Sequence, residues 1–210
     1  SRAVQGLTDH GFKATISNVI AKNGSNLLLG VAGSKGTVDR HVSSLGLDRS
    51  VFALDEKYDR HLLTLTGDKR GAAQVVILGE HTDAVFHGLA SLEQMLDQGT
   101  SDMPCVLIED YADIKYRGVI EGYYGVPYSA EVTKDLFRFM ARYKMNTYMY
   151  GAKSDEYHSR YWSDPYPTEI TEEQRRIGFL TQDMMREITD VAHATKVNFI
   201  WAIHPGRAFA

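Results

Sequence analysis

The first half of the chain carries short apolar runs separated by polar turns, a pattern that predicts buried strands. These runs lie at residues 27–31, 61–65 and 74–79. The polar segment 67–71, which has a glycine at each end, predicts a hairpin between the second run and the third. Residues 1–25 are polar and weakly patterned, so no defined element is expected there.

An amphipathic helix is expected after Gly79, because apolar residues recur there at intervals of four, three and four. They are Val85, Leu89, Leu92 and Leu96. Thr82 is the expected cap, and Gly99 lies just past the expected end of the helix. Strands followed by a helix are typical of a small α+β domain, which we place at residues 1–115.

From Tyr116 onward the pattern predicts strands and helices in strict alternation. Three strands are expected: one that ends at Ile120, one at 146–150 and one at 197–203. Because the last is nearly continuous in apolar residues, we expect it to be covered on both faces. One helix should begin at Ser129, and a capping box of Thr171 and Gln174 should open the other. The apolar face of the first is expected at Val132, Leu136, Phe139 and Tyr143, and that of the second at Ile177, Leu180, Met184, Ile188 and Val191.

This alternation predicts right-handed β-α-β crossovers, hence an α/β region of parallel strands at residues 116–210. Three strands and two helices are too few for most complete open sheets and for an eight-stranded barrel. The region is therefore expected to need sequence that this chain does not contain. Because Ser1 is not an initiator methionine and no signal sequence follows it, we interpret both ends as boundaries within a longer protein.

Composition narrows the function classes. The 210 residues are 43% apolar and 24% charged, as expected of a soluble globular protein of one or two domains. Twenty-seven acidic residues outnumber 23 basic ones, which argues against binding nucleic acid, and no apolar run is long enough to span a bilayer. No cofactor is expected, because the glycines of 33–37 lack a P-loop ending and no dinucleotide fingerprint occurs.

Metal and disulfide chemistry is not expected either. Cys105 is the single cysteine, and its position in the apolar segment 104–108 predicts a buried side chain in a strand. The histidines of the first half are not paired at the spacing of metal ligands: they are His10, His41, His61, His81 and His87.

Candidate chemistry lies in the three segments that follow the strands of the second half, at 121–125, 151–158 and 204–207. Parallel strands present such segments at one edge, so their side chains are expected to converge. The ring of Tyr124 suits a sugar face, while Lys153 and Asp155 can hydrogen-bond hydroxyl groups, which favours a neutral polyol as ligand.

Each of these residues also has a structural interpretation. Tyr124 could be a half-buried packing residue, Lys153 a solvated loop lysine, and His204 the cap of a strand end. Glu121 is interpreted as structural, with Arg117 as one candidate ion-pair partner.

Three segments of the second half resemble the opening of the catalytic barrel in glycoside hydrolase family 84. They run from Arg117 to Tyr128, from Lys144 to His158 and from Trp201 to Gly206. The order and spacing of all three carry the resemblance over about 95 residues. Residues 1–115 resemble the domain that precedes this barrel in position and layout only.

The resemblance implies that residues 116–210 are the first three β-α units of a truncated TIM (β/α)8 barrel. It implies a parent enzyme that removes terminal β-linked N-acetylglucosamine by a retaining, substrate-assisted mechanism. The expected substrate is a GlcNAc-containing glycan or glycoprotein, and the residues expected to bind it are Gly122, Tyr124, Lys153, Asp155, His158 and His204.

The chain departs from the family pattern at two motifs. Ala152 to Asp155 replace the usual Pro-Lys-Asp-Asp, and Pro127-Tyr128 replaces Pro-Trp. The catalytic pair of adjacent aspartates is expected beyond Ala210, since no Asp-Asp pair occurs in the chain. The 210-residue piece alone is therefore expected to be inactive.

Alternatives remain open at this stage. Residues 1–115 could act as a non-catalytic carbohydrate-binding or interaction module, with the barrel start as a remnant. Open apolar strand edges make self-association a further expectation. The residues leave the location undetermined, and the resemblance implies a secreted or periplasmic one for a bacterial source.

Overall fold

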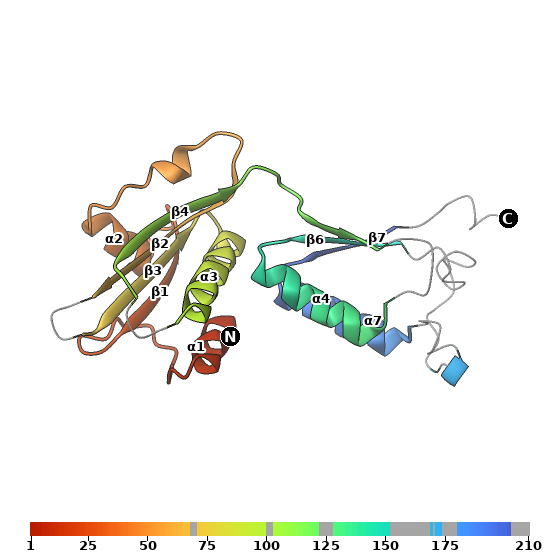
Figure 1. Ribbon diagram of the computed structural model, residues 1–210. Coiled ribbons are helices and arrows are strands. Elements are labelled where there is room, and N and C mark those ends of the chain that lie inside the picture. The colour runs from red at the N-terminus through yellow and green to blue at the C-terminus, as the bar shows by residue number, and fades with distance from the viewer. Residues whose placement is uncertain are drawn as a thin grey trace. The chain divides into compact units, whose positions relative to one another are not determined.

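The structure is a computed structural model that describes residues 1–67, 71–99, 103–121, 128–151, 169, 171–173 and 180–202. The chain divides into two compact units, Ser1–Lys115 and Tyr116–Ala210. Each unit has its own sheet (Figure 1). A mixed α/β architecture with both sheets and helices, as the sequence predicts, is therefore present.

The sheet of the first unit has four strands in the order β1-β3-β2-β4. They are β1 (Asn26–Val31), β2 (Tyr58–Gly67), β3 (Ala73–Gly79) and β4 (Val106–Ala112). β3 runs parallel to β1 and antiparallel to β2, which also pairs antiparallel with β4. The predicted pairing of 61–65 with 74–79 is confirmed, although residues 68–70 of its turn lie outside the described residues.

Helices cover both faces of this sheet (Figure 1). They are α1 (Arg2–Asp9), α2 (Thr37–Ser44), the 3-10 turn η1 (Ser50–Ala53) and α3 (Thr82–Asp97). Alternate strand residues point to opposite faces, so Leu63 and Ile77 pack on α3, while Leu62, Val76 and Leu78 pack on the side of α2. The predicted apolar face of α3, Val85, Leu89, Leu92 and Leu96, is buried as expected.

Three local predictions in this unit are wrong. Residues 2–9 form a helix, which Arg2 holds to α3 through both oxygens of Glu93, at 2.6 and 2.9 Å. The cap of α3 is His81, whose Nδ1 accepts the amide of Ala84 at 3.2 Å, so Thr82 is the first helical residue. Cys105 is exposed, because β4 begins one residue after it.

His10 gives this unit a pH-dependent contact between α1 and α3. Its Nδ1 lies 2.7 Å from the Gly6 carbonyl oxygen and its Nε2 lies 3.0 Å from Asp97 Oδ1. Both partners are acceptors, so the doubly protonated ring satisfies both. The hydrogen bond to Gly6, followed by that to Asp97, raises the pKa of His10 above its ordinary 6.5.

The stabilisation from His10 should be complete below pH 6.5 and should fade as pH rises through the raised pKa of the folded state. We expect the wild-type unfolding temperature to fall between pH 6 and pH 8 by more than that of His10→Asn. Thermal unfolding of both proteins across this range measures the difference. An identical pH profile for the two would contradict the assignment.

The second unit is built on a parallel three-stranded sheet in the order β5-β6-β7. The strands are β5 (Gly118–Ile120), β6 (Thr147–Tyr150) and β7 (Asn198–Trp201). Two helices, α4 (Ala130–Arg142) and α7 (Gln182–Ala194), lie on the same face of the sheet (Figure 1). Their shared core with the sheet is largely apolar and includes Phe137, Met140, Tyr148, Tyr150, Ile188 and Val197.

Of the four residues predicted for the apolar face of α4, Leu136 packs against the core, but the other three do not form the buried face. Val132, Phe139 and Tyr143 are each about half exposed, while Phe137 and Met140 are fully buried. The start of α4 is as predicted, since the Ser129 hydroxyl accepts the Val132 amide at 3.3 Å.

The other helix differs in its start. Residues 172 and 173 are helical directly after Thr171, as predicted, while Gln174 lies outside the described residues. α7 has a separate, later start at Gln182, after the cap Thr181.

The face of this sheet away from α4 and α7 carries an apolar row. Ile120, Met149 and Ile200 are in register on that face, and Ile120 and Ile200 are 65% and 39% exposed. The prediction that the last strand is covered on both faces is therefore not met by the described residues, because their helices pack on one face only. Within the same residues, no helix has the length and apolar character needed to cross a membrane.

Candidate functional site

The carboxyl ends of the three parallel strands form one edge of the second unit's sheet. β5 continues its ladder into Glu121, whose amide donates to the Met149 carbonyl oxygen at 2.9 Å. β7 continues in the same way, since the Ala202 amide donates to the Tyr150 carbonyl oxygen at 2.8 Å. The chain therefore leaves all three strands at the same edge, as parallel pairing in register requires.

The six predicted binding residues belong to the segments that leave this edge. They are Gly122, Tyr124, Lys153, Asp155, His158 and His204, and all six lie outside the described residues. The structure describes the strand ends from which these segments start.

Glu121 is a charged residue that directly follows β5. It is 5% exposed, and its Oε1 accepts the amide of Tyr128 at 2.8 Å while its Oε2 accepts the hydroxyl of Tyr148. Sequence reasoning missed both partners. Arg117, the candidate partner it offered, donates its guanidinium to the Lys144 carbonyl oxygen at 2.9 and 3.1 Å.

A signal for one of these partners was present in the sequence. Val119 is level with Tyr148 in the register of β5 and β6. Glu121, two residues later, lies on the same face. A tyrosine within an apolar strand needs a hydrogen-bond partner when it is buried. Glu121 is a charged residue on the same face as Tyr148 and could have been proposed as that partner.

Tyr148 stays protonated at this position. Burial first, and then the hydrogen bond to Glu121, raise the pKa of its hydroxyl well above the ordinary value. The hydroxyl is thus a permanent donor to the carboxylate. The ring is packed edge-on against Phe137 at a centroid distance of 5.0 Å and lies 6.0 Å from Phe199, which fixes the direction of the donated hydrogen bond.

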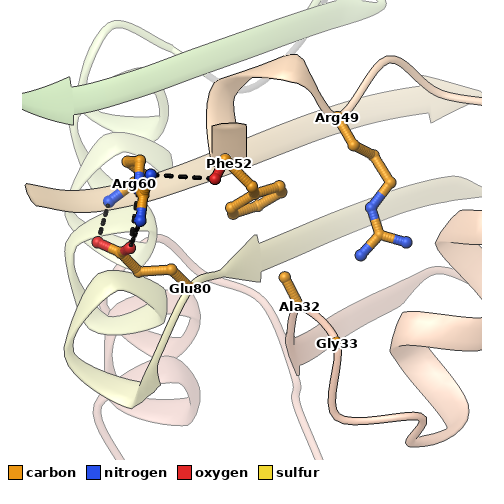
Figure 2. Close-up of a pocket in the computed structure, with 6 residues that line it drawn as sticks. All are labelled: Ala32, Gly33, Arg49, Phe52, Arg60 and Glu80. Carbon is orange, nitrogen blue, oxygen red and sulfur yellow. Dashed lines mark hydrogen bonds and ion pairs between the residues drawn. The ribbon is translucent and has the colours of Figure 1, made fainter. Parts of the chain in front are cut away.

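A shallow pocket of about 430 Å³ lies in the first unit. Figure 2 shows its lining: Ala32, Gly33, Arg49, Phe52, Arg60 and Glu80. Its charged groups are engaged with neighbouring groups of the protein. Arg60 binds Glu80 Oε2 at 2.6 and 2.8 Å and the Phe52 carbonyl oxygen at 3.0 Å. Arg49 pairs with Asp39 at 2.8 Å.

These pairings make the pocket structural rather than catalytic in character. Burial alone would raise the pKa of Asp39, but the hydrogen bonds from the Lys35 amide and from Arg49 outweigh it and lower that pKa. The carboxylate stays ionised and holds the loop before α2. Little hydrogen-bonding capacity is left for a ligand.

Three histidines gather near β2, although the sequence shows them scattered. Nε2 of His81 and of His87 lie 3.7 and 3.6 Å from the carboxylate of Asp59, and His61 Nε2 lies 3.5 Å from Asp110 Oδ2. In the part of the chain that the structure describes, no group of three or more His, Cys, Asp or Glu side chains is arranged to hold a metal ion.

Comparison with known proteins connects both units to glycoside hydrolases. A family model described as beta-N-acetylglucosaminidase matches residues 117–210, and one described as glycosyl hydrolase family 20, domain 2, matches residues 34–111. Protein O-GlcNAcase of Rattus norvegicus and that of Mus musculus are each 34% identical to this chain over 89 residues. That stretch is 42% of this chain and 8% of each relative, so the chain spans a small part of their length.

Two solved structures match nearly the whole chain. The structure titled CpGH84D has a TM-score of 0.80 at 36% identity, over 97% of this chain and 31% of that one. The structure titled CpGH84B has a TM-score of 0.64 at 27% identity, over 98% of this chain and 32% of that one. With a match to one glycosidase family model in each of its two units, the chain is similar to the N-terminal part of glycoside hydrolase family 84 proteins.

Proposed function

We propose that this chain supplies the sugar-binding part of an enzyme that hydrolyses terminal β-linked N-acetylglucosamine. The observation that carries the proposal is the common carboxyl edge of β5, β6 and β7, within the region that matches the beta-N-acetylglucosaminidase model. Active sites of parallel β-α architectures lie at this edge. The names of the relatives, which include O-GlcNAcase, support the same reaction class.

The proposal includes the fold that surrounds the edge. Residues 116–210 would open a (β/α)8 barrel, in which α4 and α7 belong to the outer ring. The exposed apolar row of Ile120, Met149 and Ile200 supports this arrangement, because the strands of such a barrel point layers of branched apolar side chains inward. The open edges of β5 and β7 would then pair with further strands of the same protein.

The binding residues follow from this placement. Gly122 and Tyr124 come after β5, Lys153, Asp155 and His158 after β6, and His204 after β7. Tyr124 would present an apolar ring face to the sugar, while Lys153 and Asp155 would hydrogen-bond its hydroxyl groups.

The proposed mechanism is retaining and substrate-assisted. The carbonyl oxygen of the substrate's 2-acetamido group attacks the anomeric carbon as the leaving oxygen receives a proton from a carboxylic acid. Water then opens the resulting oxazoline, with the same carboxylate as base. No two aspartates are adjacent in this chain, so we assign the binding of the sugar to it and the acid-base step to further sequence of the complete protein.

The test compares the complete protein that contains this chain with its Lys153→Ala variant on an aryl β-N-acetylglucosaminide. Loss of a charged hydrogen bond to a sugar hydroxyl should lower kcat/KM about 10- to 100-fold, while Lys22→Ala, at an exposed lysine of the first unit, should change nothing. The matching aryl β-glucoside, which lacks the acetamido group, should not be cleaved. Binding without hydrolysis by the complete protein would favour a carbohydrate-binding module instead.

A further inference from the structure

Glu121 joins the end of one element to the start of the next. Its own amide extends the ladder between β5 and β6, which fixes its backbone. Its Oε1 accepts the amide of Tyr128, the residue just before Ser129, the cap of α4. Six residues, 122–127, separate these two anchored positions. One side chain thus holds both the point where β5 ends and the point where α4 begins.

The second oxygen of the carboxylate is held from the core. Tyr148 donates to Oε2, and its ring is fully buried among Phe137 and Phe199. The packed interior of the unit therefore fixes the direction of the carboxylate.

A buried carboxylate is a costly way to fill space. Burying a charge is unfavourable unless hydrogen bonds replace the water it loses, and an apolar side chain would fill the same volume without that cost. A carboxylate differs from other side chains of its size in having two acceptor oxygens. Those two oxygens let Glu121 accept from two elements at once, which is the property that the geometry uses.

We propose that Glu121 is a positioning residue, which fixes the distance between the end of β5 and the start of α4 and thereby tunes the affinity for N-acetylglucosamine. This inference rests on the proposed function for its second half, because Gly122 and Tyr124 lie between the two anchors. Glu121 itself has both oxygens turned to the protein and does not contact the sugar.

The first arm of the test does not depend on the substrate. In the complete protein, Glu121→Ala should speed hydrogen exchange of the Tyr128 amide about tenfold or more, since its acceptor is removed. Glu121→Gln should restore most of the protection, because its carbonyl oxygen still accepts from Tyr128 and its amide group can donate to the Tyr148 oxygen. Amides in the middle of α4 should change little in either variant.

The second arm measures kinetics on the aryl β-N-acetylglucosaminide. Glu121→Ala should raise KM about tenfold or more while kcat falls less, with Glu121→Gln close to wild type. Tyr148→Phe, which removes one of the two bonds to the carboxylate, should raise KM by a smaller factor and covers the case in which Glu121→Ala does not fold.

Lys134→Met is the matched control. Lys134 is a buried charged residue of the same helix, paired with Glu131 at 2.7 Å and Glu187 at 2.8 Å, and it does not touch the anchors. Its substitution should lower the unfolding temperature and leave both KM and Tyr128 exchange unchanged.

The outcomes separate the two ideas. Unchanged exchange at Tyr128 in Glu121→Ala overturns the positioning role, whatever the enzyme does. Faster exchange with unchanged KM overturns the effect on affinity and keeps the proposed function. Faster exchange in a protein that neither binds nor cleaves N-acetylglucosaminides overturns the proposed function, and with it the effect on affinity. A KM that rises equally in Glu121→Ala and Lys134→Met would show that Glu121 contributes only to general stability.

Discussion

Replacing Gly118 with alanine is expected to destabilise the second unit by more than about 3 kcal/mol, a large fraction of the stability of a typical domain. Gly118 lies opposite Thr147 in the pairing of β5 with β6. A Cβ atom on Gly118 would overlap the carbonyl oxygen of Thr147 and lie 2.6 Å from its carbonyl carbon. Both atoms belong to the backbone, so no side-chain rotation can relieve the overlap.

The consequence reaches the whole edge of the sheet. β5 has only three residues, and the carbonyl oxygen of the neighbouring Arg117 accepts the amides of Asn146 and Thr147 at 2.8 and 3.0 Å. Moving the strand aside for a methyl group would break these bonds and shift Glu121. Urea unfolding followed by circular dichroism measures the loss of stability.

Gly67→Ala is the control for Gly118→Ala. Gly67 also lies in a strand, but apart from its own atoms and its two chain neighbours no atom of the described residues is within 4 Å of a Cβ built there. We expect its stability to stay within about 0.5 kcal/mol of wild type. Equal unfolding midpoints for the two alanine variants would show that the close approach at Gly118 is not a constraint.

The strands of the first unit could be predicted from the sequence because their signal is local. Apolar runs bounded by glycine gave β1, β2 and β3 close to their observed bounds, and a buried strand needs little more than such a run. The face of α3 followed for the same reason, since Val85, Leu89 and Leu92 repeat at helical spacing.

The misses depend on partners that are distant in sequence. The helix at residues 2–9 is stabilised by Arg2, which binds Glu93 and stacks 4.0 Å from the ring centroid of Phe86. Both partners are more than 80 residues away in the sequence, so no local pattern near residue 2 predicts them. The predicted burial of Cys105 failed for a different, local reason, because β4 begins one residue after it.

The site divides in the same way. The three strand ends were found because alternation of strands and helices implies parallel pairing, and the structure contains it. The partners of Glu121 were not found because they depend on a hydroxyl from β6 and an amide from the start of α4. The six binding residues remain predictions, since they lie outside the described residues.

The face of α4 shows most clearly why a pattern can mislead. Two stripes run along this helix at helical spacing. Val132, Phe139 and Tyr143 make the more apolar one, but the buried one also contains Thr133 and Lys134. Lys134 can lie on the buried side because its ammonium group reaches Glu131 and Glu187 while its stem packs below. A charged residue paired with carboxylates of both α4 and α7 thus lies on the core face, and a hydropathy pattern does not identify that face.

The two stripes predict very different losses of stability for two phenylalanines on one helix. Phe137→Ala should cost about 3–5 kcal/mol of stability, because its ring is fully buried and contacts Tyr148 and Phe199 at centroid distances of 5.0 and 5.8 Å. Phe139→Ala should cost less than about 1 kcal/mol, because its ring is 51% exposed and its ring contact is with Tyr143 on the same surface.

Urea unfolding of the two variants in this chain gives the comparison directly, since both lose the same atoms from the same helix and share the same change in helix propensity. A larger loss for Phe139→Ala would restore the face that the sequence pattern predicted and would place Phe137 outside the core. In the complete protein, by contrast, the proposed barrel would cover the stripe of Val132, Phe139 and Tyr143 with a neighbouring helix of the outer ring. The cost of Phe139→Ala should then rise by about 1–3 kcal/mol, as expected for burying an aromatic side chain, while that of Phe137→Ala stays the same.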